Sequence, residues 1–171
     1  LFIKGTAENV RRRLCAAIGI ESSGNAEAIV CNYCEFIALV HDIGKLTPAF
    51  QRKLKDNIQG LADRLLDAGI DLSDLTHISE SPHNIAGQYI LKKEFEVAPS
   101  TAVIVGAHHG DCSSDRGQCS YKANYYGHGK VNVNEWTQIR AEWMEYALSV
   151  AGFENVNNLP NPDIAAQMLI T

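Results

Sequence analysis

Residues 34–51 read CEFIALVHDIGKLTPAFQ, and this stretch governs how the rest of the chain is interpreted. An apolar run from Phe36 to Val40 ends in the pair His41-Asp42, and Lys45 follows. Ionisable side chains are rare at the buried end of an apolar segment unless they are paired or bind something. The stretch therefore predicts a helix whose end carries functional side chains.

The composition of the chain is that of one ordinary globular domain spanning residues 1–171. The formal net charge is −5, so the protein lacks the long-range attraction to nucleic acid that a basic protein has. Five cysteines are an odd number and no secretory signal is recognisable, which argues against a disulfide framework. No apolar stretch reaches the ~20 residues of a membrane span, so we expect no membrane contact and a cytoplasmic location.

Helical periodicity dominates the sequence, and no convincing alternating strand is found. The short run TAVIV (101–105) has strand propensity but would have no partner strand, so the expected fold class is all-α. The clearest amphipathic segment is 132–152, where Trp136, Ile139, Trp143, Tyr146 and Val150 recur every three or four residues as one apolar stripe. The expected helices are 7–18, 25–43, 48–58, 60–68, 83–95, 99–109, 132–152 and one from 163 onward.

Four of the six histidines lie at the ends of apolar helical segments. Because helix ends converge where a bundle has a pocket, these side chains are expected to meet there. Neutral imidazole is a good ligand for Zn, Mn, Fe, Co or Ni, and a carboxylate can bridge two ions. The candidate metal ligands are His41, Asp42, His83, His108 and His109, and Lys45 would meet anionic oxygen in the same pocket.

Each of these signals has an ordinary explanation when taken alone. A lone buried histidine is more often a hydrogen-bonded core residue than a ligand, and short motifs match by chance. His77 and His128 lie in polar segments and are expected to be solvated. The combination at three separate helix ends is what favours a shared metal site.

Three stretches carry a resemblance to a known family: LVHDIGKLTPAFQ (39–51), SPHNIAGQYIL (81–91) and VIVGAHHGD (103–111). They resemble HD-superfamily metal-dependent phosphohydrolases, and more closely the HD nuclease domain of the CRISPR type I helicase-nuclease. The resemblance implies a helical bundle that holds two divalent ions (Mn, Fe, Ni or Co, with Mg possible) and degrades single-stranded DNA. It also implies two partners: a superfamily 2 helicase domain, fused or separate, and the CRISPR surveillance complex.

The resemblance further implies a role for each candidate residue. His41 would ligate the first ion, Asp42 would bridge both, and His83, His108 and His109 would ligate the second. The two ions would generate a hydroxide that attacks phosphorus, and Lys45 would lie near the scissile phosphate.

Two features depart from the family pattern. The family's first histidine ligand would fall at or just before Phe2, where no ligand residue stands, and its last aspartate ligand would fall beyond residue 171. We therefore expect a fragment that lacks the N-terminal start and a C-terminal helix. A natural one-metal variant is the alternative.

Residues 110–132 form a long segment rich in Gly, Ser, Asn and Tyr. Loops of this length in a compact domain are usually functional or mobile. Tyrosines for base stacking and basic side chains for phosphates would make it a path for single-stranded DNA, although a self-packed loop is an equal alternative. The candidate substrate-binding residues are Arg116, Tyr121, Lys122, Tyr125, Tyr126 and Lys130.

Two rival functions remain open from the sequence. An HD phosphohydrolase acting on nucleotides or cyclic dinucleotides would use the same metal ligands, although the TPAFQ extension (47–51) counts against it. A domain that no longer catalyses and serves as a docking module is the second rival, and its only support is the absent first histidine.

Overall fold

The computed structural model is all-α and describes residues 4–20, 25–55, 57–70, 72, 75, 78–110, 126–127 and 133–162. Within those residues no strand occurs, so the expected fold class is confirmed. In the same residues no helix combines the length and the apolar character that a membrane crossing requires. The α-helices are α1 (Lys4–Ala17), α2 (Ala26–Val40), α3 (Pro48–Lys55), α4 (Leu61–Asp67), α5 (His83–Lys93), α6 (Pro99–Gly106) and α7 (Val133–Val150), and the short 3₁₀ helices are η1 (Ile43–Lys45), η2 (Ile78–Glu80) and η5 (Val156–Asn158).

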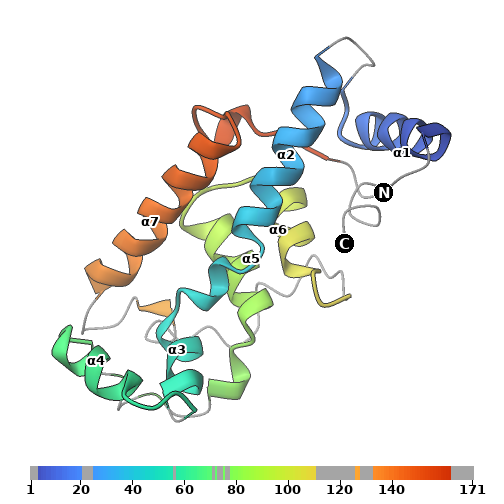
Figure 1. Cartoon of the computed structure of the whole chain (residues 1–171). Coiled ribbons are helices and arrows are strands. Elements are labelled where there is room, and N and C mark those ends of the chain that lie inside the picture. The colour runs from blue at the N-terminus through green and yellow to red at the C-terminus, as the bar shows by residue number, and fades with distance from the viewer. Residues whose placement is uncertain are drawn as a thin grey trace.

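Helix α2 is the central element of the bundle and packs against α1, α6 and α7 (Figure 1). Its apolar side chains recur with helical period, and Tyr33, Phe36 and Val40 are completely buried. Helix α6 is buried from Thr101 to Gly106, as expected for a segment that is apolar on all sides. Helix α5 packs against α6 and against η1, the short helix that follows α2. The C-terminal ends of α2 and α6 thereby come close to the N-terminal end of α5.

The expectation that the second helix runs to Ile43 is wrong at its C-terminal end. Helix α2 ends at Val40, and His41 is its C-terminal cap, with its N–H donating to the carbonyl of Ile37. Asp42 leaves the helical conformation, with φ −103° and ψ 13°, and caps η1 instead. The backbone therefore leaves the helical path between His41 and Asp42.

The apolar stripe expected on the last long helix does not face the core. Of its five members only Trp136 is buried, whereas Ile139, Trp143, Tyr146 and Val150 are exposed by 38%, 39%, 54% and 42%. The buried side of α7 is instead formed by Trp136, Arg140, Met144, Ala147 and Leu148. Apolar side chains occupy both sides of this helix, so periodicity alone chose the wrong one.

Several expectations fall outside the described residues. These are the helix from residue 163 onward, His77, His128, most of the 110–132 segment and the first three residues of the chain.

Candidate metal centre

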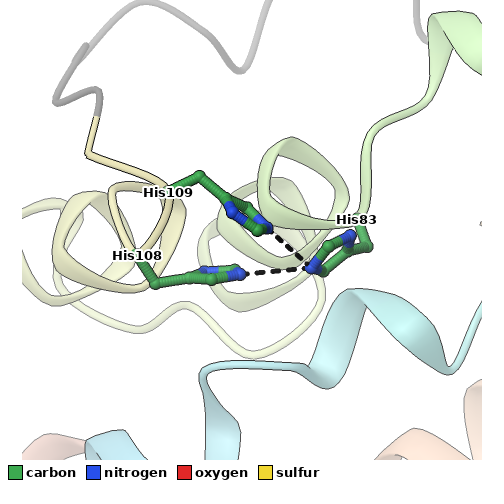
Figure 2. A group of neighbouring side chains, drawn as sticks. All are labelled: His83, His108 and His109. Atoms are coloured by element: carbon green, nitrogen blue, oxygen red, sulfur yellow. Dashed lines mark hydrogen bonds between the residues drawn. The ribbon is translucent and has the colours of Figure 1, made fainter.

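Three histidines from two helix ends point toward one another (Figure 2). His83 is the first residue of α5, and His108 and His109 lie in the turn directly after α6. The Nε2 atom of His83 lies 3.2 Å from Nε2 of His108 and 3.1 Å from Nε2 of His109. One ligand atom from each of the three residues falls within 4.8 Å of the others, a spacing at which they could hold a metal ion together.

The carboxylate of Asp42 faces this cluster with one oxygen and a second group with the other. Oδ1 lies 3.3 Å from Nε2 of His83 and 3.8 Å from Nε2 of His108. Oδ2 lies 3.1 Å from Nε2 of His41 and 2.7 Å from Nζ of Lys45. Asp42 therefore stands between two sets of side chains, as a ligand shared by two neighbouring ions would.

Backbone carbonyls orient two of the imidazole rings. The Nδ1–H of His41 donates to the carbonyl of Ala38 at 2.7 Å, and the Nδ1–H of His108 donates to the carbonyl of Val105 at 2.6 Å. A carbonyl oxygen only accepts, so Nδ1 carries a proton in both rings and Nε2 is the nitrogen that can bind a metal. This is the arrangement found in metal-binding histidines, whose second nitrogen is usually held by a carbonyl or carboxylate.

Burial keeps two of the histidines neutral. Desolvation is the main cause that lowers the pKa of His83 to about 4, and the neighbouring His108 and His109 lower it further, against an opposing effect from Asp42. Desolvation likewise lowers the pKa of His108, partly opposed by its hydrogen bond to Val105. Because imidazole binds metals only when it is unprotonated, these rings are available as ligands at neutral pH.

Asp42 stays ionised for the opposite reason. Burial alone would raise its pKa, but the hydrogen bond from Lys45 and the electrostatic effects of His41, Lys45 and His83 together lower it below the ordinary value. The site thus combines a carboxylate held in its charged form with two imidazoles, those of His83 and His108, whose neutral form burial favours. Both are the forms that bind cations.

Close backbone contact fixes the distance between the two halves of the site. A Cβ placed on Gly44 would lie 1.8 Å from the carbonyl oxygen of His83 and 2.6 Å from the amide nitrogen of Gly87, so only glycine fits there. The side chain of Asn84, which is 7% exposed, donates to the carbonyl of Gly106 at 3.1 Å. The first contact ties η1 to α5, and the second ties the start of α5 to the end of α6.

Sequence reasoning missed the residues that support the site. Thr47 Oγ1 donates to the carbonyl of Gly44 at 2.8 Å, and Gln51 Nε2 donates to the carbonyl of Lys45 at 2.9 Å. The ring of Phe50 packs edge-on against His83, with centroids 5.3 Å apart. These residues all belong to the TPAFQ extension, so the signal was present, but the motif alone did not reveal which backbone groups they hold.

The donor set fits divalent transition-metal ions. Neutral imidazole nitrogens and an ionised carboxylate suit Mn, Fe, Co, Ni or Zn, whereas an all-oxygen set would favour Mg or Ca. The structure brings His41, Asp42, Lys45, His83, His108 and His109 together as expected from the sequence. Their individual roles as ligands remain a proposal.

The substrate-binding expectations fare differently. Tyr126 is 3% exposed and its ring packs on Tyr89 with centroids 5.0 Å apart, which leaves little of the ring face for a base, and its role in substrate binding stays a prediction. The other candidates lie outside the described residues; they are Arg116, Tyr121, Lys122, Tyr125 and Lys130.

A helical bundle in which a His-Asp pair meets histidines from later helices defines the HD class of domains. Comparison with known proteins narrows the class. Residues 1–171 match the family model described as "Cas3, HD domain", and the chain belongs to that family, one of CRISPR-associated metal-dependent nucleases.

Two relatives illustrate the likeness. The chain is 34% identical over 171 residues to the CRISPR-associated nuclease/helicase Cas3 of Streptococcus thermophilus, an alignment that covers 89% of this chain and 18% of that protein. A solved structure of a CRISPR-associated protein matches with a TM-score of 0.66 and 24% identity, over 94% of this chain and 17% of the other. The second likeness supports the fold alone, and the chain spans less than a fifth of each relative.

Proposed function

We propose that this chain is the nuclease domain of a CRISPR-associated nuclease-helicase, and that it hydrolyses phosphodiester bonds in single-stranded DNA with two divalent transition-metal ions. The observation that carries the proposal is the position of Asp42, whose Oδ1 faces His83 and His108 and whose Oδ2 faces His41 and Lys45. A superfamily 2 helicase domain, fused or separate, and the CRISPR surveillance complex are the proposed partners.

His41 and Asp42 would hold one ion, and Asp42, His83, His108 and His109 would hold the other. When bound, ions in such a site polarise phosphoryl oxygens and lower the pKa of water, so that hydroxide becomes available at neutral pH. The metal charge would also supply the attraction to phosphate that a chain of net charge −5 lacks.

Lys45 would contact the substrate directly. Its ammonium group has three N–H donors, one of which is committed to Oδ2 of Asp42 at 2.7 Å. Its side chain is 40% exposed, so it reaches solvent at the edge of the cluster. A phosphate oxygen that entered there would meet a cation whose position is fixed by the same carboxylate that binds the metals.

The test is cleavage of circular single-stranded DNA by the protein in Mn²⁺ or Ni²⁺, with EDTA as the blank. The variant Asp42→Ala removes the shared carboxylate and is expected to lower the rate at least about 100-fold while helical content is retained. Asp67→Ala is the matched control, because Asp67 is an exposed carboxylate at the end of α4. Activity of Asp42→Ala equal to that of Asp67→Ala would refute the assignment.

The rival functions give different results in the same assay. Hydrolysis of nucleotides or cyclic dinucleotides with the DNA circle left intact would support a nucleotide phosphohydrolase. Failure to bind either metal, measured by elemental analysis after dialysis, would support a docking module.

A further inference from the structure

A buried ion pair between α7 and the end of α5 contacts the segment Asp42–Leu46, which carries two residues of the candidate metal centre. Arg140 of α7 is 0% exposed, and its Nε and Nη2 donate to the two carboxylate oxygens of Glu94 at 2.8 and 2.9 Å. Glu94 caps the C-terminal end of α5. The remaining nitrogen, Nη1, donates to the carbonyl oxygen of Leu46 at 2.9 Å.

Leu46 ends the segment that begins with Asp42. Three consecutive carbonyls of this segment, those of Gly44, Lys45 and Leu46, each accept a hydrogen bond from a side chain. The donors to the first two, Thr47 and Gln51, are only three and six residues away along the chain. The donor to Leu46 lies 94 residues away and so anchors the segment to the body of the bundle.

An ion pair is not the most stabilising way to pack α7 against α5. Two charges lose their hydration on burial, and well-packed apolar side chains of similar size are often as stabilising or more so. An apolar pair, however, would leave the carbonyl of Leu46 without this donor. The guanidinium of Arg140 can bind both partners, because two of its nitrogens match the carboxylate of Glu94 and the third remains for the carbonyl of Leu46.

We propose that Arg140, oriented by Glu94, is a positioning residue for the Asp42–Lys45 segment. Its hydrogen bond fixes the C-terminal end of η1, whose Lys45 amide donates to the carbonyl of Asp42 at 2.8 Å. With the C-terminal end of the segment anchored in this way, Oδ1 of Asp42 lies 3.3 Å from Nε2 of His83. The inference rests on the metal-dependent function proposed above.

The double variant Arg140→Met with Glu94→Met tests the inference, because it removes both charges together and replaces them with apolar chains of similar length. We expect a melting temperature close to that of the wild-type protein and an affinity for Mn²⁺, measured calorimetrically, about tenfold lower. In the metal-free protein, exchange of the Lys45 and Leu46 amides should become about tenfold faster, since the end of η1 is released.

Tyr33→Phe is the matched control. It deletes another buried hydrogen bond, the 2.8 Å contact between Tyr33 and Thr101, and leaves η1 untouched. It should change neither Mn²⁺ affinity nor exchange at Lys45. If the double variant matched this control in both measurements, the pair would have a purely structural role and the proposal would be overturned.

Arg140→Lys decides the question if the double variant fails to fold. A lysine keeps a cation beside Glu94, but its single nitrogen cannot serve that carboxylate and the carbonyl of Leu46 with the same geometry. For Arg140→Lys we expect faster exchange of the Lys45 and Leu46 amides and weaker Mn²⁺ affinity than in wild type, and wild-type values of both would overturn the proposal. If the wild-type protein bound no metal, the proposed function would fail, whereas amide exchange in the metal-free variants would still test the anchor.

Discussion

Replacing Gly44 by alanine should damage the metal centre although it adds only one methyl group. The new Cβ would lie 1.8 Å from the carbonyl oxygen of His83, a distance well under the 3.0 Å below which real Cβ contacts are essentially never seen. The obstacle is backbone on α5, which cannot rotate away as a side chain would. Segment η1 and helix α5 must therefore separate.

The distance by which η1 and α5 must separate determines how far Asp42 moves from His83. Moving from 1.8 to 3.0 Å takes 1.2 Å, because 3.0 − 1.8 = 1.2. Added to the 3.3 Å between Asp42 Oδ1 and His83 Nε2, it would place these two ligand atoms about 4.5 Å apart if the shift lay along that line. Overpacking of this kind costs about 2–3 kcal/mol, which in a chain of this length lowers the melting temperature by about 4–12 °C.

Thermal unfolding and Mn²⁺ titration of Gly44→Ala measure both consequences, and we expect a metal affinity at least about tenfold lower. Gly87→Ala is the matched control across the same contact. Its Cβ would meet the Gly44 amide nitrogen at 3.4 Å, an ordinary contact, and alanine favours the helix by about 1 kcal/mol. Equal melting temperatures and equal Mn²⁺ affinities for the two variants would refute the reasoning.

Three further outcomes are expected. In EDTA, the free energy of unfolding should fall by about 1–2 kcal/mol between pH 7.5 and pH 5. The reason is that the unfolded chain protonates His83 near its ordinary pKa of 6.5, whereas the folded chain does so only at about 4. Urea titrations should show a smaller fall for His83→Gln than for the wild-type protein. Lys45→Met should raise the pKa of Asp42, since its hydrogen bond helps to lower it, and Mn²⁺ titrations across pH should show proton competition beginning at a higher pH than in wild type. Asn84→Ala should lower the melting temperature by about 2–6 °C, because the carbonyl of Gly106 loses a buried donor; an unchanged value in calorimetry would show that water replaces the amide.

The sequence was most informative where a single property, such as apolar periodicity, determined which residues are buried. The apolar side chains of helix α2 recur with helical period, and Tyr33, Phe36 and Val40 on that face are buried. The histidines stood out because polar residues at the ends of apolar segments need a reason to be there. That argument located the cluster without any knowledge of distances.

The register of α7 could not be predicted in the same way. Trp136, Arg140 and Met144 recur at spacing four on its buried side, and the arginine in the middle makes that row look polar. The competing row, with Ile139, Trp143 and Val150, is uniformly apolar and therefore resembles a core face, although it faces solvent. Tertiary contacts with Glu94 and with the carbonyl of Leu46 allow an arginine to be buried, and no local pattern encodes partners 46 and 94 residues away.

The supporting hydrogen bonds were hidden for a related reason. Thr47, Gln51 and Asn84 donate to backbone carbonyls. Because every residue has a backbone carbonyl, the sequence does not indicate which one accepts the hydrogen bond. The bend at Asp42 was equally invisible, because a helix that ends three residues early has the same composition as one that continues.

The side chains of the metal centre come from chain segments around residues 41–45, 83 and 108–109, which only the folded state brings within reach of one another. An ion captured there would bind the native chain far more strongly than the denatured one, so each bound ion would shift the folding equilibrium by mass action. The supply of metal in the cell would then regulate the abundance of this domain as well as its chemistry, with starvation leaving a larger unfolded fraction open to proteolysis.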